Sequence, residues 1–204
     1  MQLSNRWEDL LSALVQHLEL VSWSMAFAIL FGVPLGILVT RFPSLKKWIV
    51  GGAGISQTIP SLALLGLMIP IFGLGVQTAI AALFLYSLLP IIRNTFTGIL
   101  AVDKSIIDAA KGMGLTGGQI LFKVEMPLAL PTIIAGIRTA VVINIGTATI
   151  AAFIGAGGLG DFIFIGISRN IDVLVLIGAI PTALLAIFID SILGFFEKKL
   201  ASKG

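Results

Sequence analysis

The sequence predicts an all-α protein that crosses a lipid bilayer about five times, and three observations predict it. Of the 204 residues, 57% are hydrophobic and only 11% are charged, against about 25% charged residues in a typical soluble domain. The apolar residues form runs of about 20, the length that a helix needs to cross a hydrocarbon core of roughly 30 Å. An open sheet would leave unpaired backbone groups in lipid, so we expect helices. This composition excludes a soluble enzyme, a disordered chain and, because cysteine is absent, a disulfide-rich secreted scaffold.

Five apolar segments are long enough to cross the membrane. Their approximate ranges are 18–40, 48–69, 76–92, 132–154 and 173–196. The second segment contains Gln57 and Pro60 near its middle. Because Pro60 lacks a backbone N–H group, we expect a kink there, with neighbouring groups satisfying the freed carbonyl.

The rest of the chain divides around these spans. Residues 1–17 are expected to form a short interfacial helix, because apolar side chains from Trp7 to Val15 recur at helical spacing. This segment lacks the basic start and short apolar core of a secretory signal. We assign residues 18–199 to the membrane domain, which includes a loop at about 103–127, and residues 200–204 to a C-terminal tail.

The distribution of basic residues predicts the orientation. If the loop between the third and fourth spans is cytoplasmic, eleven of the 13 Lys and Arg residues lie on or near the inner side, and only Arg6 and Arg169 lie outside. The eleven are Arg41, Lys46, Lys47, Arg93, Lys104, Lys111, Lys123, Arg138, Lys198, Lys199 and Lys203. Because basic residues collect on the cytoplasmic side of membrane proteins, we expect the N-terminus outside and the C-terminus in the cytoplasm.

The loop between the third and fourth spans has about 38 residues, far more than a helix connection needs. Asp103 can cap a first short helix, which a run of glycines then interrupts. Thr116, with Gln119 three residues later, forms a capping-box pattern for a second short helix. We expect the prolines that follow, Pro127 and Pro131, to end this helix before the fourth span begins.

The sequence of this loop resembles the EAA motif of permease subunits in binding-protein-dependent ABC importers. Asp108-Ala109-Ala110 stands at the position of Glu-Ala-Ala, Gly114 stands at the following glycine, and Val124-Glu125-Met126-Pro127 replaces Ile-x-Leu-Pro. The resemblance implies that the loop is a coupling helix that docks into a groove on a cytoplasmic ATPase. It gives this role to Asp108, Ala109, Ala110, Gly112, Gly114, Leu115, Val124 and Pro127.

Four further motifs resemble those of permeases for osmoprotectants, namely glycine betaine, carnitine, choline and related quaternary amines. They are Gln57-Thr58-Ile59-Pro60-Ser61-Leu62-Ala63, Leu85-Tyr86-Ser87-Leu88-Leu89-Pro90, Asn144-Ile145-Gly146-Thr147-Ala148-Thr149 and Ile154-Gly155-Ala156-Gly157-Gly158-Leu159-Gly160. The resemblance covers roughly residues 15–200 and implies the MetI-like fold of type I ABC importer permeases. It further implies ATP-driven import of such amines by alternating access.

The resemblance also implies partners, in the cell membrane of a prokaryote. They are a second permease subunit, identical or homologous, two ATP-binding subunits and an extracytoplasmic substrate-binding protein. We expect neither catalysis nor a cofactor in this chain, because it lacks the G-x-x-x-x-G-K-[ST] loop that holds ATP phosphates. ATP and magnesium would bind to the partner ATPase. Because the chain has a single histidine, no histidine cluster could bind a metal. The excess of basic residues is explained by their place at the cytoplasmic side of the membrane, so we expect no nucleic-acid partner.

A few polar residues fall within the apolar spans. Gln57 and Ser61 are four residues apart, and Asn144 and Thr147 are three apart, so each pair shares a helix face. Such groups line a pathway or hydrogen-bond to other helices, because lipid offers them no partner. The sequence leaves both alternatives open for Gln57, Pro60, Ser61, Asn144 and Thr147.

Two charged residues are expected inside the membrane. Arg138 and Asp190 each lie about six residues, or roughly 9 Å, from the cytoplasmic ends of the fourth and fifth spans. A lone charge at that depth costs a few kcal/mol, so we expect the two to form an ion pair. The alternative for Arg138 is that its side chain reaches the inner lipid headgroups.

Other functions are weighed against the permease. A permease for another small solute, such as an amino acid, fits the same motifs. A secondary transporter or channel would need no ATPase and would leave the loop motif unexplained. An intramembrane enzyme would need a catalytic constellation, which the sequence does not place. Trp7, Trp23 and Trp48 fall near span ends, as interfacial anchors do, and no aromatic cage is evident, so tight substrate binding is expected in a separate protein.

Overall fold

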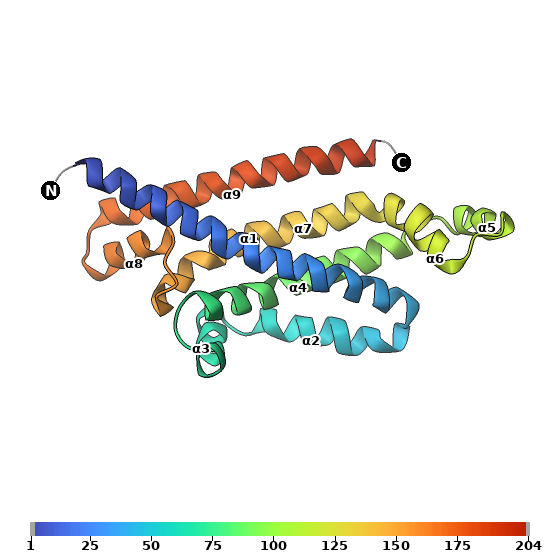
Figure 1. Cartoon of the computed structure of the whole chain (residues 1–204), viewed down its shortest axis with the longest axis horizontal. Coiled ribbons are helices and arrows are strands. Elements are labelled where there is room, and N and C mark those ends of the chain that lie inside the picture. The colour runs from blue at the N-terminus through green and yellow to red at the C-terminus, as the bar shows by residue number, and fades with distance from the viewer. Residues whose placement is uncertain (1–2, 203–204) are drawn as a thin grey trace.

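The computed structural model describes residues 3–202, and all regular secondary structure in that range is helical. Four long helices run roughly along the longest dimension of the molecule (Figure 1): α1 (Leu3–Arg41), α4 (Val76–Leu100), α7 (Met126–Ala148) and α9 (Asp172–Ala201). Each is long and apolar enough to cross a membrane. The predicted all-α membrane architecture is therefore confirmed.

The first helix, α1, extends without a break over 39 residues. The expected helix is therefore not a short one, because residues 3–17 are the first turns of α1. No glycine or proline lies between Trp7 and Leu18, so nothing in the backbone interrupts the helix there. At 1.5 Å per residue α1 is roughly 58 Å long, about twice the thickness of a hydrocarbon core.

The second predicted span consists of two short helices, α2 (Lys46–Thr58) and α3 (Ser61–Phe72), whose axes meet at 107°. Ile59 is extended, as a residue before proline prefers to be, and Pro60 has no N–H group to continue the helix. The Tyr86 hydroxyl of α4 donates a hydrogen bond to the Ile59 carbonyl, which satisfies a group that the break frees. The expected kink is thus a full break. The described residues contain four single helices that are long enough to span a membrane, and a fifth span exists only if α2 and α3 together form it.

Glycines allow the central helices to approach closely. Gly36 of α1 faces Thr95 of α4, and a Cβ atom added to Gly36 would lie 2.5 Å from the Thr95 Cβ. Gly136 of α7 faces Asn94 of α4 at the same 2.5 Å. Larger side chains at these two positions would push α1 and α7 away from α4, so the glycines fix the spacing at the centre of the bundle.

The last helix, α9, lies at the periphery. It packs on α7 and on α8 (Gly160–Ser168). Most of its apolar surface is exposed, including Leu184, Ile187 and Phe188. A largely apolar outer surface is what a helix that faces lipid requires.

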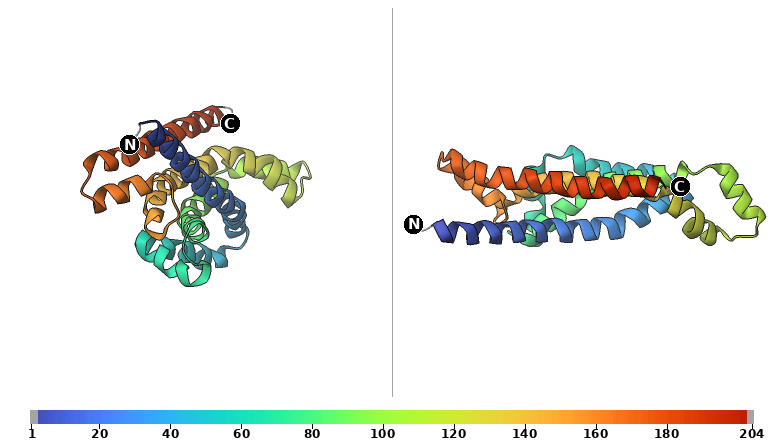
Figure 2. Two further views of the ribbon diagram at one scale, coloured as in Figure 1. Left: turned by 60° about the vertical axis from the view of Figure 1, so that its left-hand side comes forward. Right: turned by 90° about the horizontal axis from the view of Figure 1, so that it is seen from above.

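The shorter elements join the long helices. η1 (Pro43–Leu45) connects α1 to α2. The loop helices α5 (Lys104–Gly112) and α6 (Gly117–Ile120) project from one end of the bundle, as both views in Figure 2 show. Helix α6 continues through a π-helix, η2 (Leu121–Glu125), directly into α7, and α7 continues into the 3-10 helix η3 (Thr149–Ile154). One helical rod of 38 residues therefore joins the loop to the opposite end of the bundle.

The prediction that Pro127 and Pro131 end the second loop helix is wrong. In η2 the Met126 N–H donates to the carbonyl of Leu121, five residues earlier, so the hydrogen-bond register shifts before the prolines. Pro127 then occupies the first turn of α7, where a missing N–H group is tolerated. Pro131 lies inside α7, which continues past it.

Candidate functional site

The loop that resembles a coupling helix is capped as its sequence predicts. The Asp103 carboxylate accepts a hydrogen bond of 2.8 Å from the Ser105 N–H, and this bond lowers the pKa of the carboxyl group. Thr116 and Gln119 form both hydrogen bonds of a capping box, Thr116 N–H to Gln119 Oε1 at 2.9 Å and Gln119 N–H to Thr116 Oγ1 at 3.4 Å. The two short helices are therefore held by local contacts of their own.

The residues of the EAA-like motif form an exposed elbow. Asp108 is exposed and forms an ion pair of 3.1 Å with Lys111, while Ala110 of the same helix, α5, is buried. Gly114 has φ of +80°, a conformation that side chains with a Cβ rarely adopt. The remaining motif residues are placed as follows: Ala109, Gly112 and Pro127 are exposed, and Leu115 and Val124 are half-buried.

The elbow also exposes large apolar side chains that sequence reasoning missed. Met113 is 73% exposed, Phe122 is 69% exposed and Ile106 is 44% exposed. Exposed apolar side chains that gather on a loop projecting from the bundle are typical of a surface that another protein covers. Their places within a charged, glycine-rich segment could have indicated this surface from the sequence.

An ion pair anchors the base of the loop. Arg41, the last residue of α1, donates hydrogen bonds from both terminal nitrogens to the carboxylate of Glu125 in η2. The Glu125 side chain is only 5% exposed, so it depends on this partner. Sequence reasoning missed the pair, because nothing local connects positions 41 and 125.

The structure brings Arg138 of α7 and Asp190 of α9 together. Arg138 Nε lies 2.5 Å from Asp190 Oδ1, and Nη2 lies 2.6 Å from Oδ2. Nη1 adds a hydrogen bond of 3.1 Å to Glu197 Oε2. Sequence reasoning missed Glu197, although it lies seven residues after Asp190 and therefore on the same face of α9.

The candidate pathway residues lie in different surroundings, and only Asn144 among them is buried between helices. Asn144 is fully buried, and its amide donates to Ser24 Oγ of α1 at 2.9 Å and to Ser87 Oγ of α4 at 2.8 Å. This arrangement matches the interhelical alternative. The exposed Gln57 donates to the Tyr86 carbonyl at 2.9 Å, and Thr147 donates to the Ile143 carbonyl of its own helix at 2.9 Å. Pro60 and Ser61 lie at the break between α2 and α3.

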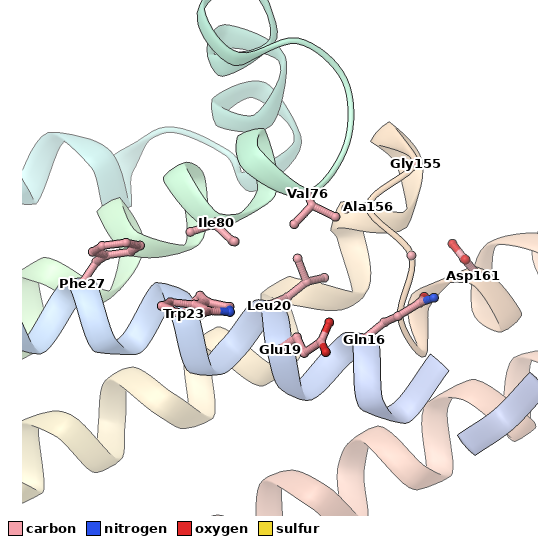
Figure 3. A pocket seen from close by; sticks show the side chains of 11 residues that line it. Gln16, Glu19, Leu20, Trp23, Phe27, Val76, Ile80, Gly155, Ala156 and Asp161 are labelled. Atoms are coloured by element: carbon pink, nitrogen blue, oxygen red, sulfur yellow. The ribbon is translucent and has the colours of Figure 1, made fainter. Parts of the chain in front are cut away.

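A cavity of about 680 Å³ lies near the end of the bundle where α8 is found, opposite the loop helices α5 and α6 (Figure 1). Figure 3 shows the residues that line it. Its walls come from α1, the start of α4, the glycine turn at 155–158 and the start of α8. Glu19, Trp23 and Phe27 of α1 and Asp161 of α8 are among the residues that line it. Partial burial raises the pKa of the Asp161 carboxyl group. Sequence reasoning missed this site, although the four-residue spacing of the three α1 residues was a signal for it.

Known proteins have sequences similar to that of this chain. The family model for the binding-protein-dependent transport system inner membrane component matches residues 32–202. The glycine betaine/carnitine/choline transport system permease protein OpuCD of Bacillus subtilis is 46% identical over 91% of this chain and 82% of its own length. The osmoprotectant import permease protein OsmW of Salmonella typhimurium is 48% identical over 96% of this chain and 93% of its own.

A solved structure shows the same fold. The inward-facing MetNI methionine ABC transporter contains a chain that superposes with a TM-score of 0.85 and 25% identity, over 98% of this chain and 99% of that one. The predicted MetI-like permease fold is confirmed. The chain belongs to the family of binding-protein-dependent transport system inner membrane components, and it is a membrane-spanning permease subunit of an ABC importer.

Proposed function

We propose that this permease imports osmoprotectant quaternary amines, namely glycine betaine, carnitine and choline. The observation that carries the substrate class is identity of 46–48% over more than nine-tenths of the chain to permeases whose names specify these solutes or osmoprotectants. An amino acid is the alternative substrate, because the fold also matches that of a methionine transporter.

The loop at 103–127 receives the movement of a partner ATPase. Its exposed elbow and the apolar Met113 and Phe122 form a docking surface outside the bundle. The loop continues into the helical rod that ends at Ile154, so a displacement of α6 moves α7 with it. Arg41 holds Glu125 at the base of this rod, which ties the end of α1 to the same movement.

Alternating access then follows from the way α7 is held. Asn144 joins α7 to α1 and α4 at the buried centre of the bundle, and Arg138 joins it to α9. A rod held at these places tilts as a unit, which opens one end of the bundle while the other closes. Gln57, Pro60 and Ser61 lie at the break between α2 and α3, a place where the backbone bends against α4 as α7 tilts.

The assembly contains a second permease subunit, two ATP-binding subunits and an extracytoplasmic substrate-binding protein. ATP and magnesium bind to the ATPase chains, which carry out hydrolysis, and this chain holds no cofactor. The proposed orientation places the loop and the C-terminus in the cytoplasm and the N-terminus outside.

Cysteine labelling tests the orientation, because the native chain has no cysteine. Single cysteines at Ser44, Thr116 and Ser202 should resist an impermeant thiol reagent added outside intact cells, whereas one at Ser168 should react. All four positions are exposed in the fold, so burial within this chain does not account for a difference in their labelling. Labelling of Thr116→Cys from outside would contradict the orientation and the coupling role.

Uptake by the reconstituted importer tests the substrate class. Proteoliposomes that contain the permease, its ATPase and its binding protein should accumulate radiolabelled glycine betaine, carnitine or choline only when ATP is supplied. Methionine is the matched control solute. Uptake that needs no ATP would contradict the importer mechanism, and uptake of methionine without any of the amines would contradict the substrate class.

A further inference from the structure

The cavity opposite the loop combines three features that point to one kind of ligand. Its volume of about 680 Å³ falls within the range of roughly 300–1,000 Å³ that small-molecule sites occupy. Its lining includes the carboxylates of Glu19 and Asp161, and no Lys, Arg or His side chain is among the described residues that line it. Trp23 and Phe27 supply aromatic rings. An acidic and aromatic cavity favours a cation.

The aromatic rings are available to a ligand. Trp23 is 58% exposed and Phe27 is 42% exposed, and their ring centroids lie 6.3 Å apart with planes inclined by 30°. The face of an aromatic ring attracts an organic cation, and tryptophan does so most strongly. A quaternary ammonium group has no N–H to donate, so ring faces and carboxylates are the groups that recognise it.

One of the two carboxylates, Glu19, lies next to the rings along α1. Glu19, Trp23 and Phe27 follow one another at intervals of four residues, about 6 Å along one face of α1. Asp161 reaches the same cavity from α8 (Figure 3). Among the described side chains, neither carboxylate takes part in an ion pair shorter than 4.0 Å. Their charge is therefore left to act on whatever occupies the cavity.

The wall between α1 and α8 is fixed in place. The Gly158 N–H donates a hydrogen bond of 3.1 Å to Gln16 Oε1, which fastens the glycine turn to α1. Gly157 has φ of +77° and lies so close to Gln16 that a Cβ atom would clash with the amide. The cavity is therefore a built feature of the fold.

We propose that this cavity binds a small quaternary ammonium solute before it crosses the membrane, with the rings of Trp23 and Phe27 against the methylated ammonium group. The assignment rests on the proposed substrate class and orientation, which place the cavity on the outer side. The lining of the cavity adds a preference among these solutes. Two carboxylates with no basic residue beside them in the lining favour a cation such as choline over a zwitterion such as glycine betaine.

Choline binding to the permease–ATPase complex, purified without the binding protein, tests the proposal. Radiolabelled choline should bind saturably, tetramethylammonium should displace it, and 3,3-dimethyl-1-butanol, its uncharged carbon analogue, should not. Glycine betaine should compete more weakly than choline. Equal competition by the uncharged analogue would overturn the cation assignment.

Variants locate the binding. Trp23→Leu and the double variant Glu19→Gln/Asp161→Asn should each weaken choline binding about fivefold or more, and Trp23→Phe should retain part of it. Trp48→Leu and Glu8→Gln are matched controls, because both residues are exposed and neither lines the cavity. Choline binding that is unchanged in all the cavity variants would overturn the site.

The same preparation separates this proposal from the substrate class. If the wild-type importer takes up the amines but the cavity variants bind choline normally, the cavity assignment fails and the proposed function stands. If the wild-type importer takes up none of the amines, the proposed substrate class fails. The displacement of bound choline by tetramethylammonium then still tests whether the cavity binds a quaternary ammonium group. Loss of choline binding in vesicles that contain phosphatidylcholine would instead show that the cavity binds a lipid headgroup. That result would contradict the proposal that it binds a small solute.

Discussion

Two arginines secure the same helical rod in different surroundings. Arg41 comes from the end of α1 and holds Glu125, whose side chain is 5% exposed, at the base of the loop. Arg138 lies within α7 and holds Asp190 and Glu197 of α9, and all three side chains are about one-third exposed. The first contact has one buried acceptor, and the second has two acceptors that are partly open. Attachment of the loop therefore depends on a single partner, whereas attachment of α9 is shared.

Removal of Arg41 should have the largest effect on stability. Arg41→Met leaves the Glu125 charge buried without its partner, which destabilises a protein by about 3–5 kcal/mol. We expect a lower melting temperature and a lower yield of folded complex in detergent.

A double variant provides the control for this loss. Arg41→Met/Glu125→Gln should recover part of the stability, because no buried charge remains. Lys47→Met removes an exposed charge nearby that forms no ion pair among the described residues. If Arg41→Met loses no more stability than Lys47→Met, the buried pair does not anchor the loop.

The Arg138 cluster should show a smaller and asymmetric loss. Arg138→Leu leaves two carboxylates without a partner, whereas Asp190→Leu leaves Arg138 bound to Glu197. We expect Arg138→Leu to be the more damaging, and the loss in the double variant to be smaller than the sum of the two single losses. The measurement is a double-mutant cycle on melting temperature, and strictly additive losses would show that the two residues act independently.

Glu197→Gln should be the mildest change among the ion pairs. Its hydrogen bond to Arg138 is single and partly exposed, so we expect a loss below about 1 kcal/mol. The same change in an Asp190→Leu background should cost more, because Arg138 then loses its last acceptor. Equal losses in the two backgrounds would refute the view that the carboxylates share Arg138.

Changes at the elbow should leave stability almost untouched and act on transport. Gly114→Trp places a bulky side chain on the proposed docking surface, so uptake or assembly with the ATPase should fail while the permease remains folded. Gly114→Ala is the matched control, because it introduces the same backbone strain at φ +80° without the bulky side chain. If the Gly114→Trp importer takes up substrate at the wild-type rate, Gly114 does not lie on the surface that docks on the ATPase.

The sequence predicted those features of the fold that depend on residues close together in the chain. The caps at Asp103 and Thr116 follow from residues two and three positions apart, so their spacing sufficed. Arg138 and Asp190 could be matched by their depth, since two antiparallel spans bring equal depths together. The four long helices followed from the length of the apolar runs.

The features that the sequence did not predict depend on contacts between residues that are far apart in the chain. Arg41 meets Glu125 only because α1 ends beside η2, and the cavity forms only where α1 meets α8. The prolines after the loop suggested a stop, but a π-helix shifts the register so that Pro127 falls in a tolerant first turn. Pro60 indicated a kink in the right place, while the angle of 107° depends on contacts with α4.

Site-specific photo-cross-linking tests most directly whether the loop transmits the work of the ATPase. A photoreactive residue at Met113, which is exposed at the elbow, should cross-link to the ATPase subunit in the active complex. The same photoreactive residue placed at Ile167 of α8, which is similarly exposed but lies at the other end of the bundle, should not cross-link to the ATPase. Cross-links to the ATPase from Ile167, or none from Met113 in a complex that transports, would contradict the coupling role of the loop.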